Sequence, residues 1–519
     1  MSLTRREILA ATGTVAVAAP FLTIPSVRAE TRPALPIPPI VSPDENGSIA
    51  LTAEAGQMRF VDSGMTPTFG YSGPFLGPTL RMRRGSEVEM VVTNALPEEM
   101  TVHWHGLVIP GVVDGGPHQI IKPGGTWRPA LPVDQPAATL WYHPHIYPAT
   151  AELVIKGLAG LLLVDDDETD ALGLPSTWGV DDIPIVIQDR RFEENGAFFH
   201  RFNLAAVTVG YVGDRVLVNG TQHPVAKTAK GWLRLRILNG SNARTYRLKA
   251  SDGRTLHVIG SDGGLLEAPV SMDELTVHAG ERFEVMVDAR SGEAFDLVTL
   301  PVAGSPIMHL PPFHQALSLL TFEPTGAEGN GTLPDRLASL PSFPNELPPV
   351  SGRFTMDMNL DKEGMGALMK AGIKRVMAPG GPPGEVVKAL TDLIVNGPTL
   401  PLETQLSANA VNGKSYELAE VPMNVPRGQP LRWVIDEGGD QMLHPVHIHG
   451  CQYRIVSLNG KPPVPHMAGW KDTVPIEDGG SAEILVTFPH AAPPEAPYML
   501  HCHILEHEDS GMMTQFSVT

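Results

Sequence analysis

The sequence is poor in cysteine, in aromatic residues and in positive charge. Two cysteines in 519 residues permit at most one disulfide bond, so the fold cannot depend on a disulfide framework. Aromatic residues make up 6% of the chain, and 57 acidic residues against 38 lysines and arginines give a formal net charge of −19. Such an acidic surface argues against nucleic-acid binding. Beyond the N-terminal segment, no run is apolar for long enough to cross a bilayer.

The first 29 residues are predicted to be an export signal. Arg5 and Arg6 precede an uncharged stretch over residues 8–27, and a small-residue cleavage site ends at Ala29. Two prolines interrupt the stretch, which makes it a poor membrane anchor. We therefore expect a twin-arginine signal peptide over residues 1–29, export by the twin-arginine translocation machinery, no stable membrane anchor and a periplasmic protein.

Proline and glycine are abundant, with 50 and 52 residues, as is typical of chains with many short strands and turns. One pattern of a turn glycine, an alternating strand, a loop and a second strand occurs three times, which indicates three antiparallel β-sandwiches of about 150 residues each. The predicted domains are 30–167, 178–331 and 351–519. A Pro-rich linker is predicted at 332–350, and a short helical insert is predicted at 361–395, early in the third domain.

Four His-x-His pairs are distributed over the first and third copies of this pattern. Strand side chains alternate between two faces, so each pair places both imidazoles on one face. Eight imidazoles arranged in this way could close around several metal ions at an interface between the outer domains. The middle copy has Val298-Thr299-Leu300 in the corresponding place and is predicted to be a spacer. The four pairs are His103/His105, His143/His145, His447/His449 and His501/His503.

A second metal site is predicted on the opposite face of the last His-x-His strand, because Cys502 lies between the two histidines of that pair. A thiolate, two imidazoles and a distant thioether are the ligands of a blue-copper electron-transfer site. Structural zinc is the competing interpretation, but zinc is redox-inert and gives no reason for an adjacent histidine cluster. The metal is therefore predicted to be copper, with no disulfide between Cys502 and Cys451. The residues that could join Cys502 are His444, His507 and Met512.

The motifs HWHG, HPH, HPVHIHG and HCHILEHEDSGMM resemble, in order and spacing, the four copper-binding motifs of the multicopper oxidases. The resemblance implies an all-β chain of three consecutive cupredoxin-like Greek-key β-sandwich domains with four copper ions, which couple four one-electron oxidations to the reduction of O2 to water. It implies a type 1 copper at His444, Cys502, His507 and Met512, and a type 2 copper at His103 and His447. The type 3 coppers would lie at His105, His143 and His503 and at His145, His449 and His501.

Further motifs, including VDGGP, VDQPAAT and AGWKDTV, look like those of the periplasmic CueO-type copper-tolerance oxidases, which convert Cu(I) to Cu(II). By this resemblance, Asp114 and Glu508 would help to provide protons. Thioethers suit Cu(I) and carboxylates accommodate Cu(II). The long Met/His-rich insert of many such relatives is missing, which leaves the type 1 site more open to phenols. The residues that match a substrate-copper site are Met356, Asp361, Asp440 and Met442.

Three alternatives to a cuprous oxidase stay open. The first is a laccase that acts mainly on phenols, which is chemically close. The second is a copper-free relative that acts as a cell-division or binding protein, which would keep the fold but lose ligands, whereas all twelve expected ligands are present here. The third is copper storage, which does not need an electron path through Cys502. We expect a monomeric oxidase that uses O2 and takes electrons from Cu(I) or a phenol.

Overall fold

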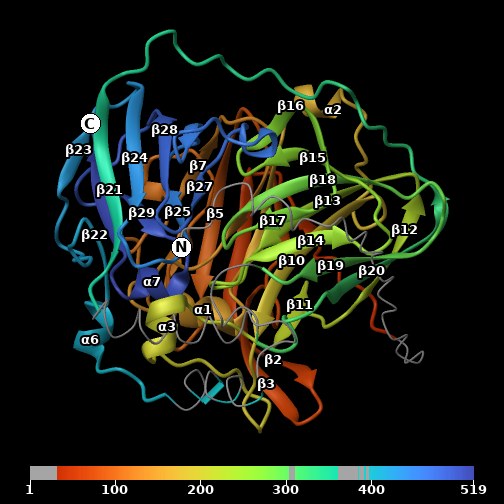
Figure 1. Cartoon of the computed structure of the whole chain (residues 1–519), viewed down its shortest axis with the longest axis horizontal. Coiled ribbons are helices and arrows are strands. Elements are labelled where there is room, and N and C mark those ends of the chain that lie inside the picture. Colours follow the sequence, from red (N-terminus) through yellow and green to blue (C-terminus); the bar gives the residue numbers. More distant parts are fainter. Residues whose placement is uncertain (1–31, 303–309, 361–383, 385–387, 389–390, 393–396) are drawn as a thin grey trace, which may run out of the picture. The chain divides into compact units, whose positions relative to one another are not determined.

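The computed structural model describes residues 32–302, 310–360, 384, 388, 391–392 and 397–519. The predicted signal peptide at 1–29, Asp361 and most of the predicted helical insert lie outside these residues. Among the described residues, no helix is both long enough and apolar enough to cross a membrane. The labelled strands and helices of Figure 1 all belong to one unit, Pro33–Thr519.

Strands dominate this unit, and they form three successive pairs of sheets, coloured red to orange, yellow to green and cyan to blue in Figure 1. The pairs occupy residues 40–165, 182–328 and 350–518. The predicted all-β class is therefore confirmed. The first two pairs fall inside predicted domains, and the third begins at Val350, one residue before the predicted start at 351. The domain boundaries themselves stay a prediction.

The first domain has one sheet of order β1-β4-β9-β8 and a second of order β3-β2-β5-β6, in which β7 also pairs with β5. Val88, Met90 and Val92 alternate along β5 and face the core between the sheets, as expected for a half-buried strand. The strands are β1 Ile40–Val41, β2 Ser48–Val61, β3 Gly64–Tyr71, β4 Thr79–Arg83, β5 Ser86–Asn94, β6 Thr126–Trp127, β7 Ala130–Val133, β8 Ala138–Tyr142 and β9 Gly160–Asp165.

The middle domain has sheets of order β11-β10-β13-β18-β15-β16 and β12-β20-β19-β14-β17. Leu233, Leu235 and Ile237 of β13 belong to its core. The strands are β10 Asp182–Arg190, β11 Arg215–Val218, β12 Val225–Lys230, β13 Trp232–Asn239, β14 Tyr246–Ala250, β15 Leu256–Ser261, β16 Gly264–Met272, β17 Leu275–Val277, β18 Arg282–Asp288, β19 Phe295–Leu300 and β20 Leu317–Glu328.

The third domain has sheets of order β22-β21-β24-β28-β26 and β23-β30-β29-β25-β27. Trp433 and Ile435 of β24 pack in its core, which also includes the side chain of Cys502. The strands are β21 Val350–Met358, β22 Asn409–Val411, β23 Met423–Val425, β24 Leu431–Glu437, β25 His444–Ile448, β26 Arg454–Leu458, β27 Thr473–Ile476, β28 Ser481–Val486, β29 Tyr498–Cys502 and β30 Met513–Val518.

The three pairs of sheets repeat one topology, which is mixed rather than purely antiparallel as predicted. β2 pairs in parallel with β5, and the pairs β10/β13 and β21/β24 correspond to it. In each case the chain passes through a strand of the opposite sheet before it returns, and parallel pairing requires a crossover of this kind. The shared crossover supports the predicted threefold repeat.

One short helix from each domain lies beside the others at the same end of the sandwiches. α7 packs against α1 and α3 (Figure 1). α1 begins with backbone amides that no helical carbonyl can satisfy, and the amides of Thr150 and Ala151 donate instead to the carboxylate of Asp509 in α7. The helices are α1 Thr150–Lys156, α2 Asp167–Asp170, α3 Leu204–Val209, α6 Leu402–Leu406 and α7 Leu505–Asp509, with 3-10 turns η1 Gly111–Val113 and η3 Pro465–Met467.

Candidate metal centre

The eight histidines of the His-x-His pairs form one buried cluster between the first and third domains. Two pairs follow β5 and β8, and the other two lie at the ends of β25 and β29. Backbone pairing joins His103 to His143 and His447 to His501. Across the interface, the rings of His103 and His449 stack with centroids 3.8 Å apart. No ring of the cluster is more than 1% exposed, so the cluster is shielded from bulk water.

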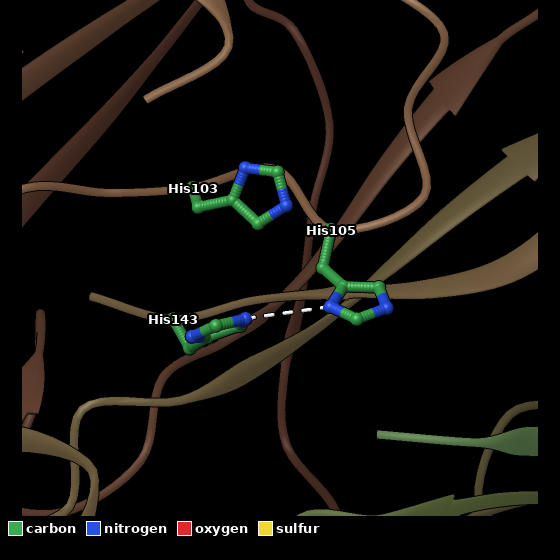
Figure 2. A group of neighbouring side chains, drawn as sticks. All are labelled: His103, His105 and His143. Carbon is green, nitrogen blue, oxygen red and sulfur yellow. Dashed lines mark hydrogen bonds between the residues drawn. The ribbon is translucent and has the colours of Figure 1, made fainter. Parts of the chain in front are cut away.

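Figure 2 shows His103, His105 and His143 with their rings directed toward a common centre. His105 Nδ1 lies 3.4 Å from His143 Nε2. The opposite nitrogen of each ring already has an acceptor: His143 Nδ1 donates to the Pro144 carbonyl at 2.8 Å, and His105 Nε2 donates to Asp472 Oδ1 at 3.1 Å. A neutral imidazole has a single N–H. The two nitrogens that face each other therefore both carry lone pairs.

A second group repeats this arrangement. His145 Nε2 and His449 Nε2 lie 3.2 Å and 3.3 Å from His501 Nε2. His449 Nδ1 donates to Asp114 Oδ2 at 2.7 Å, and His501 Nδ1 donates to the carbonyl of Cys502 at 3.1 Å. The converging Nε2 atoms of these two rings therefore also carry lone pairs.

The predicted type 2 pair is oriented by backbone carbonyls. His103 Nδ1 donates to the Asp114 carbonyl at 3.0 Å, and His447 Nδ1 donates to the Asp472 carbonyl at 2.9 Å. Both Nε2 atoms are buried without a hydrogen-bond partner, as are both ring nitrogens of His503. An unpaired buried acceptor is unfavourable in a folded protein unless a cation satisfies it.

The spacing of these nitrogens matches the edge of a metal coordination shell. Two nitrogens at about 2.0–2.1 Å from one ion, at a tetrahedral angle, lie about 3.3 Å apart, close to the separations found here. Imidazole suits copper and other late first-row metals. His145, His449 and His501 form one group whose ligand atoms lie within 4.8 Å of one another. The assignment of the other five rings to individual ions stays a prediction.

The Cys502 site is present on the opposite face of β29. Cys502 Sγ lies 3.5 Å from His444 Nδ1 and 3.6 Å from His507 Nδ1. These distances match a tetrahedral metal site, because metal–sulfur and metal–nitrogen bonds of about 2.3 and 2.0 Å place the sulfur and nitrogen about 3.5 Å apart. Sγ also accepts from the Ile504 amide at 3.4 Å. Met512 is completely buried, and its carbonyl accepts from the Cys502 amide at 3.1 Å. Both cysteines of the chain are free thiols.

The two histidines of this site differ in their surroundings. Burial lowers the pKa of His444, but hydrogen bonds to Asp440 and Cys502 outweigh it and raise the pKa to about 10. Burial and the neighbouring His444 lower the pKa of His507 to about 3. His507 Nε2 donates to the Thr208 carbonyl of α3 at 3.2 Å. In both rings Nε2 is held by an acceptor and Nδ1 faces the sulfur, as a metal ligand requires.

Comparison with known proteins assigns the chain to a family. Family models described as multicopper oxidase match residues 52–169, 198–305 and 395–519. The chain belongs to the multicopper oxidase family. The prediction of the family and of its cupredoxin-like domains is therefore confirmed. The family binds copper, and the buried thiolate and imidazole donors of this member fit that metal.

The similar proteins are named either as cell-division proteins or as oxidases. The cell division protein FtsP of Escherichia coli K12 is 32% identical over 526 residues, which cover 100% of this chain and 99% of the relative. FtsP of Yersinia pestis is 33% identical over 519 residues, 99% and 98% of the two chains. A laccase-like multicopper oxidase CueO from Ochrobactrum sp., described as active on lignin model compounds and lignosulfonate, has a TM-score of 0.78 with 37% identity, over 93% of this chain and 100% of that one.

A further solved structure, a metallo-oxidase from Campylobacter jejuni, has a TM-score of 0.74 with 26% identity, over 94% of this multicopper oxidase and 98% of that chain. The names thus include both oxidases and a cell-division protein. The closer resemblance to CueO-type oxidases stays a prediction for this family member.

The two acidic residues predicted to provide protons lie against the histidine cluster. Asp114 Oδ2 accepts from His449 Nδ1, and its Oδ1 is buried without a partner. Glu508 lies 3.4 Å from His145 Nδ1 and 3.2 Å from His501 Nδ1. Burial raises the pKa of Glu508, but these two rings outweigh it and lower the pKa to about 2. Asp114 therefore orients a predicted ligand histidine, and Glu508 lies beside two others, whereas the role of both carboxylates in proton transfer stays a prediction.

The residues predicted to bind substrate copper are described in part. Asp440 accepts from His444 Nε2 at 3.0 Å and from the Met442 amide at 2.9 Å, as predicted for a link to the type 1 ligand. Met442 is 7% exposed, whereas Met356 is completely buried in the core of the third domain. Asp361 lies outside the described residues. The substrate-copper site as a whole therefore stays a prediction.

The structure adds residues that the sequence pattern missed. Asp472 lies in the AGWKDTV motif, so a sequence signal existed, but its contact with His105 of the first domain depends on domain packing. Thr208 and Arg282 belong to the middle domain. Thr208 contacts His507, a predicted type 1 ligand, and Arg282 pairs with Asp472. The middle domain is therefore more than the predicted spacer, although no predicted ligand comes from it.

Proposed function

We propose that this chain is an active multicopper oxidase that takes electrons singly from Cu(I), and also from phenols, and uses them to reduce O2 to water. One observation carries the proposal: Cys502, the thiolate of the predicted type 1 site, is bonded directly to His501 and His503 of the histidine cluster. A storage or purely structural site has no use for such a link. The predicted ligands are buried, and hydrogen bonds to acceptors hold the second nitrogen of most of the rings, including those of His105, His143 and His449.

Four bound copper ions would supply the one-electron chemistry and hold the four electrons that O2 needs. The protein residues provide the rest. Cys502 connects the electron entry site to the cluster through covalent bonds. Asp440 accepts from His444 Nε2 and so orients that ring, and it would connect the ring to a bound reductant. Asp114 and Glu508 place carboxylates beside the cluster histidines, where they would pass protons to the cluster, and deep burial of the cluster keeps partly reduced oxygen from escaping.

The proposal includes four copper ions per chain, a monomeric enzyme, and export to the periplasm by the twin-arginine pathway on the signal at residues 1–29. Oxygen uptake by copper-loaded protein tests the activity, with Cu(I) and with a phenol as reductants. We expect four electrons to be consumed per O2 and a faster reaction with Cu(I). A phenol rate that greatly exceeds the Cu(I) rate would instead favour a laccase, and no uptake with either reductant would contradict the oxidase proposal.

A division-related role is a second candidate, because relatives named cell division protein FtsP match the full chain length. It does not exclude oxidase activity. In cells that lack this protein, we would compare rescue of division by the wild type and by Cys502→Ser. Equal rescue would separate a division role from copper chemistry. Rescue by the wild type alone would show that the division role depends on the copper chemistry of Cys502. No division defect in the deleted strain would remove the second candidate.

A further inference from the structure

One segment of the middle domain, residues 280–282, reaches the histidine cluster. Gly280, with a φ of +82°, packs so closely on the His503 ring that a Cβ atom at this position would lie 2.8 Å from the ring carbons. Two residues later, Arg282 begins β18 and is completely buried. A domain without predicted ligands therefore contacts one ligand ring directly and places a buried cation close to another.

Every N–H group of Arg282 has an acceptor. Nη1 and Nη2 donate to the two carboxylate oxygens of Asp472 at 2.7 and 2.6 Å, a bidentate pair that fixes both position and plane of the carboxylate. The remaining N–H groups donate to the carbonyls of Thr139, Gly280 and Asp262 at 3.2, 3.0 and 3.0 Å. Arginine has five N–H donors, so the guanidinium is held in a single orientation by all three domains.

The same carboxylate holds a predicted type 3 ligand. Asp472 Oδ1, which accepts from Arg282, also accepts from His105 Nε2 at 3.1 Å. Because Nε2 carries the proton, Nδ1 keeps the lone pair that faces His143, as Figure 2 shows. Gln452 Nε2 donates to the other oxygen of Asp472 at 2.8 Å, so the carboxylate has no freedom to turn away.

The chain next to His105 is built around this ion pair. Gly106 follows His105 with a φ of +92°, and a Cβ atom there would lie 2.7 Å from Arg282 Nη2 and 2.8 Å from Asp472 Oδ2. The glycine of the HWHG motif is therefore required by Arg282 and Asp472. An ion pair that served only to join domains two and three would not need a contact with the backbone of a ligand segment.

We propose that Arg282 is a positioning residue for the copper cluster: through Asp472 it fixes the orientation and the proton-bearing nitrogen of His105, so that the middle domain controls a ligand that it does not contribute. This inference rests on the proposed oxidase function. Groups that orient a ligand histidine typically change metal affinity or activity by about 10- to 100-fold when they are removed. We expect an effect of this size from Arg282.

The test compares two buried arginines of the middle domain. Arg282→Lys keeps the charge but loses the bidentate fork. Arg244→Lys makes the same change in the buried pair of Arg244 with Asp189, which does not contact a predicted ligand. Each purified protein is loaded with a Cu(II) salt, and four properties are measured: thermal unfolding of the metal-free form, copper content, the fraction of copper visible by electron paramagnetic resonance, and O2 uptake.

We expect both variants to lose stability to a similar degree and to keep the blue absorption. Only Arg282→Lys should lose copper from the cluster or show a larger fraction of copper that is visible by electron paramagnetic resonance, because His105 would no longer be held in position. Its O2 uptake should be about 10- to 100-fold lower. A wild-type copper signature in Arg282→Lys, or equal changes in both variants, would overturn the inference. Wild-type protein that binds no copper would overturn the oxidase proposal instead.

If Arg282→Lys does not fold, Asp472→Asn takes its place. The amide keeps the size of the side chain, but its NH2 group cannot accept from Arg282 Nη2 and Gln452 Nε2 as Asp472 Oδ2 does, so the bidentate clamp on the side chain is lost. Asp189→Asn is its matched control. The same spectroscopic change in Asp472→Asn alone would support the inference, and a wild-type copper signature in this variant would overturn it.

Discussion

β29 of the third domain and β19 of the middle domain occupy the same place in sheets of the same order, yet only β29 carries metal ligands. Each is the central strand of five. Cys502 of β29 lies opposite Val446 of the neighbouring strand, and Thr299 of β19 lies opposite Leu248. Thr299 is buried as fully as a core residue and accepts from the Arg247 amide. The sandwich therefore closes equally well around a ligand or around an ordinary side chain.

The difference shows that the metal chemistry is added to the sandwich rather than needed for it. The histidine cluster stands at strand ends, where two domains meet, whereas Cys502 belongs to the core of the third domain. The middle domain contributes carbonyls and one guanidinium in their place. Thr208 holds His507, and Arg282 acts on His105 through Asp472.

The largest effect is expected when the third copy is made to resemble the middle one. Cys502→Ser replaces the thiolate by a hydroxyl, much as Thr299 stands in the middle copy. The variant should fold, because the core around this position tolerates a hydroxyl in β19, but it should be colourless and without oxidase activity. Visible absorption, circular dichroism and O2 uptake measure these outcomes. A blue band that survives the change would refute the assignment of Cys502.

Glu508→Gln separates proton supply from copper binding. An amide cannot relay protons at neutral pH, so turnover should fall by about 100-fold, while blue absorption and copper content stay near those of the wild type. Glu506→Gln is the matched control in α7, because Glu506 bonds to Asn242 and the Tyr211 amide of the middle domain. Equal turnover in both variants at saturating substrate would place the proton role elsewhere.

The double change Met356→Leu/Met442→Leu tests a distinction between substrates. Met-to-Leu exchanges nearly conserve volume and usually cost less than about 1.5 kcal/mol each, so the buried Met356 can be changed without loss of the fold. If both thioethers bind Cu(I), its oxidation should fall by about tenfold or more, and oxidation of a bulky phenol should persist. Steady-state rates with Cu(I) and with the phenol measure the two effects. Equal losses on both would indicate damage at His444.

The smallest effect is expected from Met512→Leu. A thioether is only a weak, long axial ligand, so the blue colour should remain, and the reduction potential should rise because a donor to Cu(II) is lost. A redox titration followed by visible absorption measures the shift. A colourless variant would show that Met512 binds far more strongly than an axial ligand.

The sequence was sufficient to predict which histidines gather and which residues surround Cys502, but not the residues that hold these side chains in place. Strand parity alone placed Cys502 opposite to His501 and His503, and the structure agrees. Local spacing carries such information because it depends only on the chain within one strand. The contact of Arg282 with Asp472 joins residues 190 positions apart, and no local pattern records such a pair. The parallel crossovers were missed for the same reason.

The separation of the ligands along the chain also bears on how the protein assembles. His145 Nε2 and His501 Nε2 lie 3.2 Å apart but are 356 positions apart in the sequence. Contacts of such high order form late, because the entropy of closing a long loop opposes them. A nascent chain without its third domain therefore cannot offer a complete cluster to a metal ion. Ions that bind only the assembled state also shift the equilibrium toward it. Full copper occupancy would therefore indicate that the first and third domains have folded and assembled.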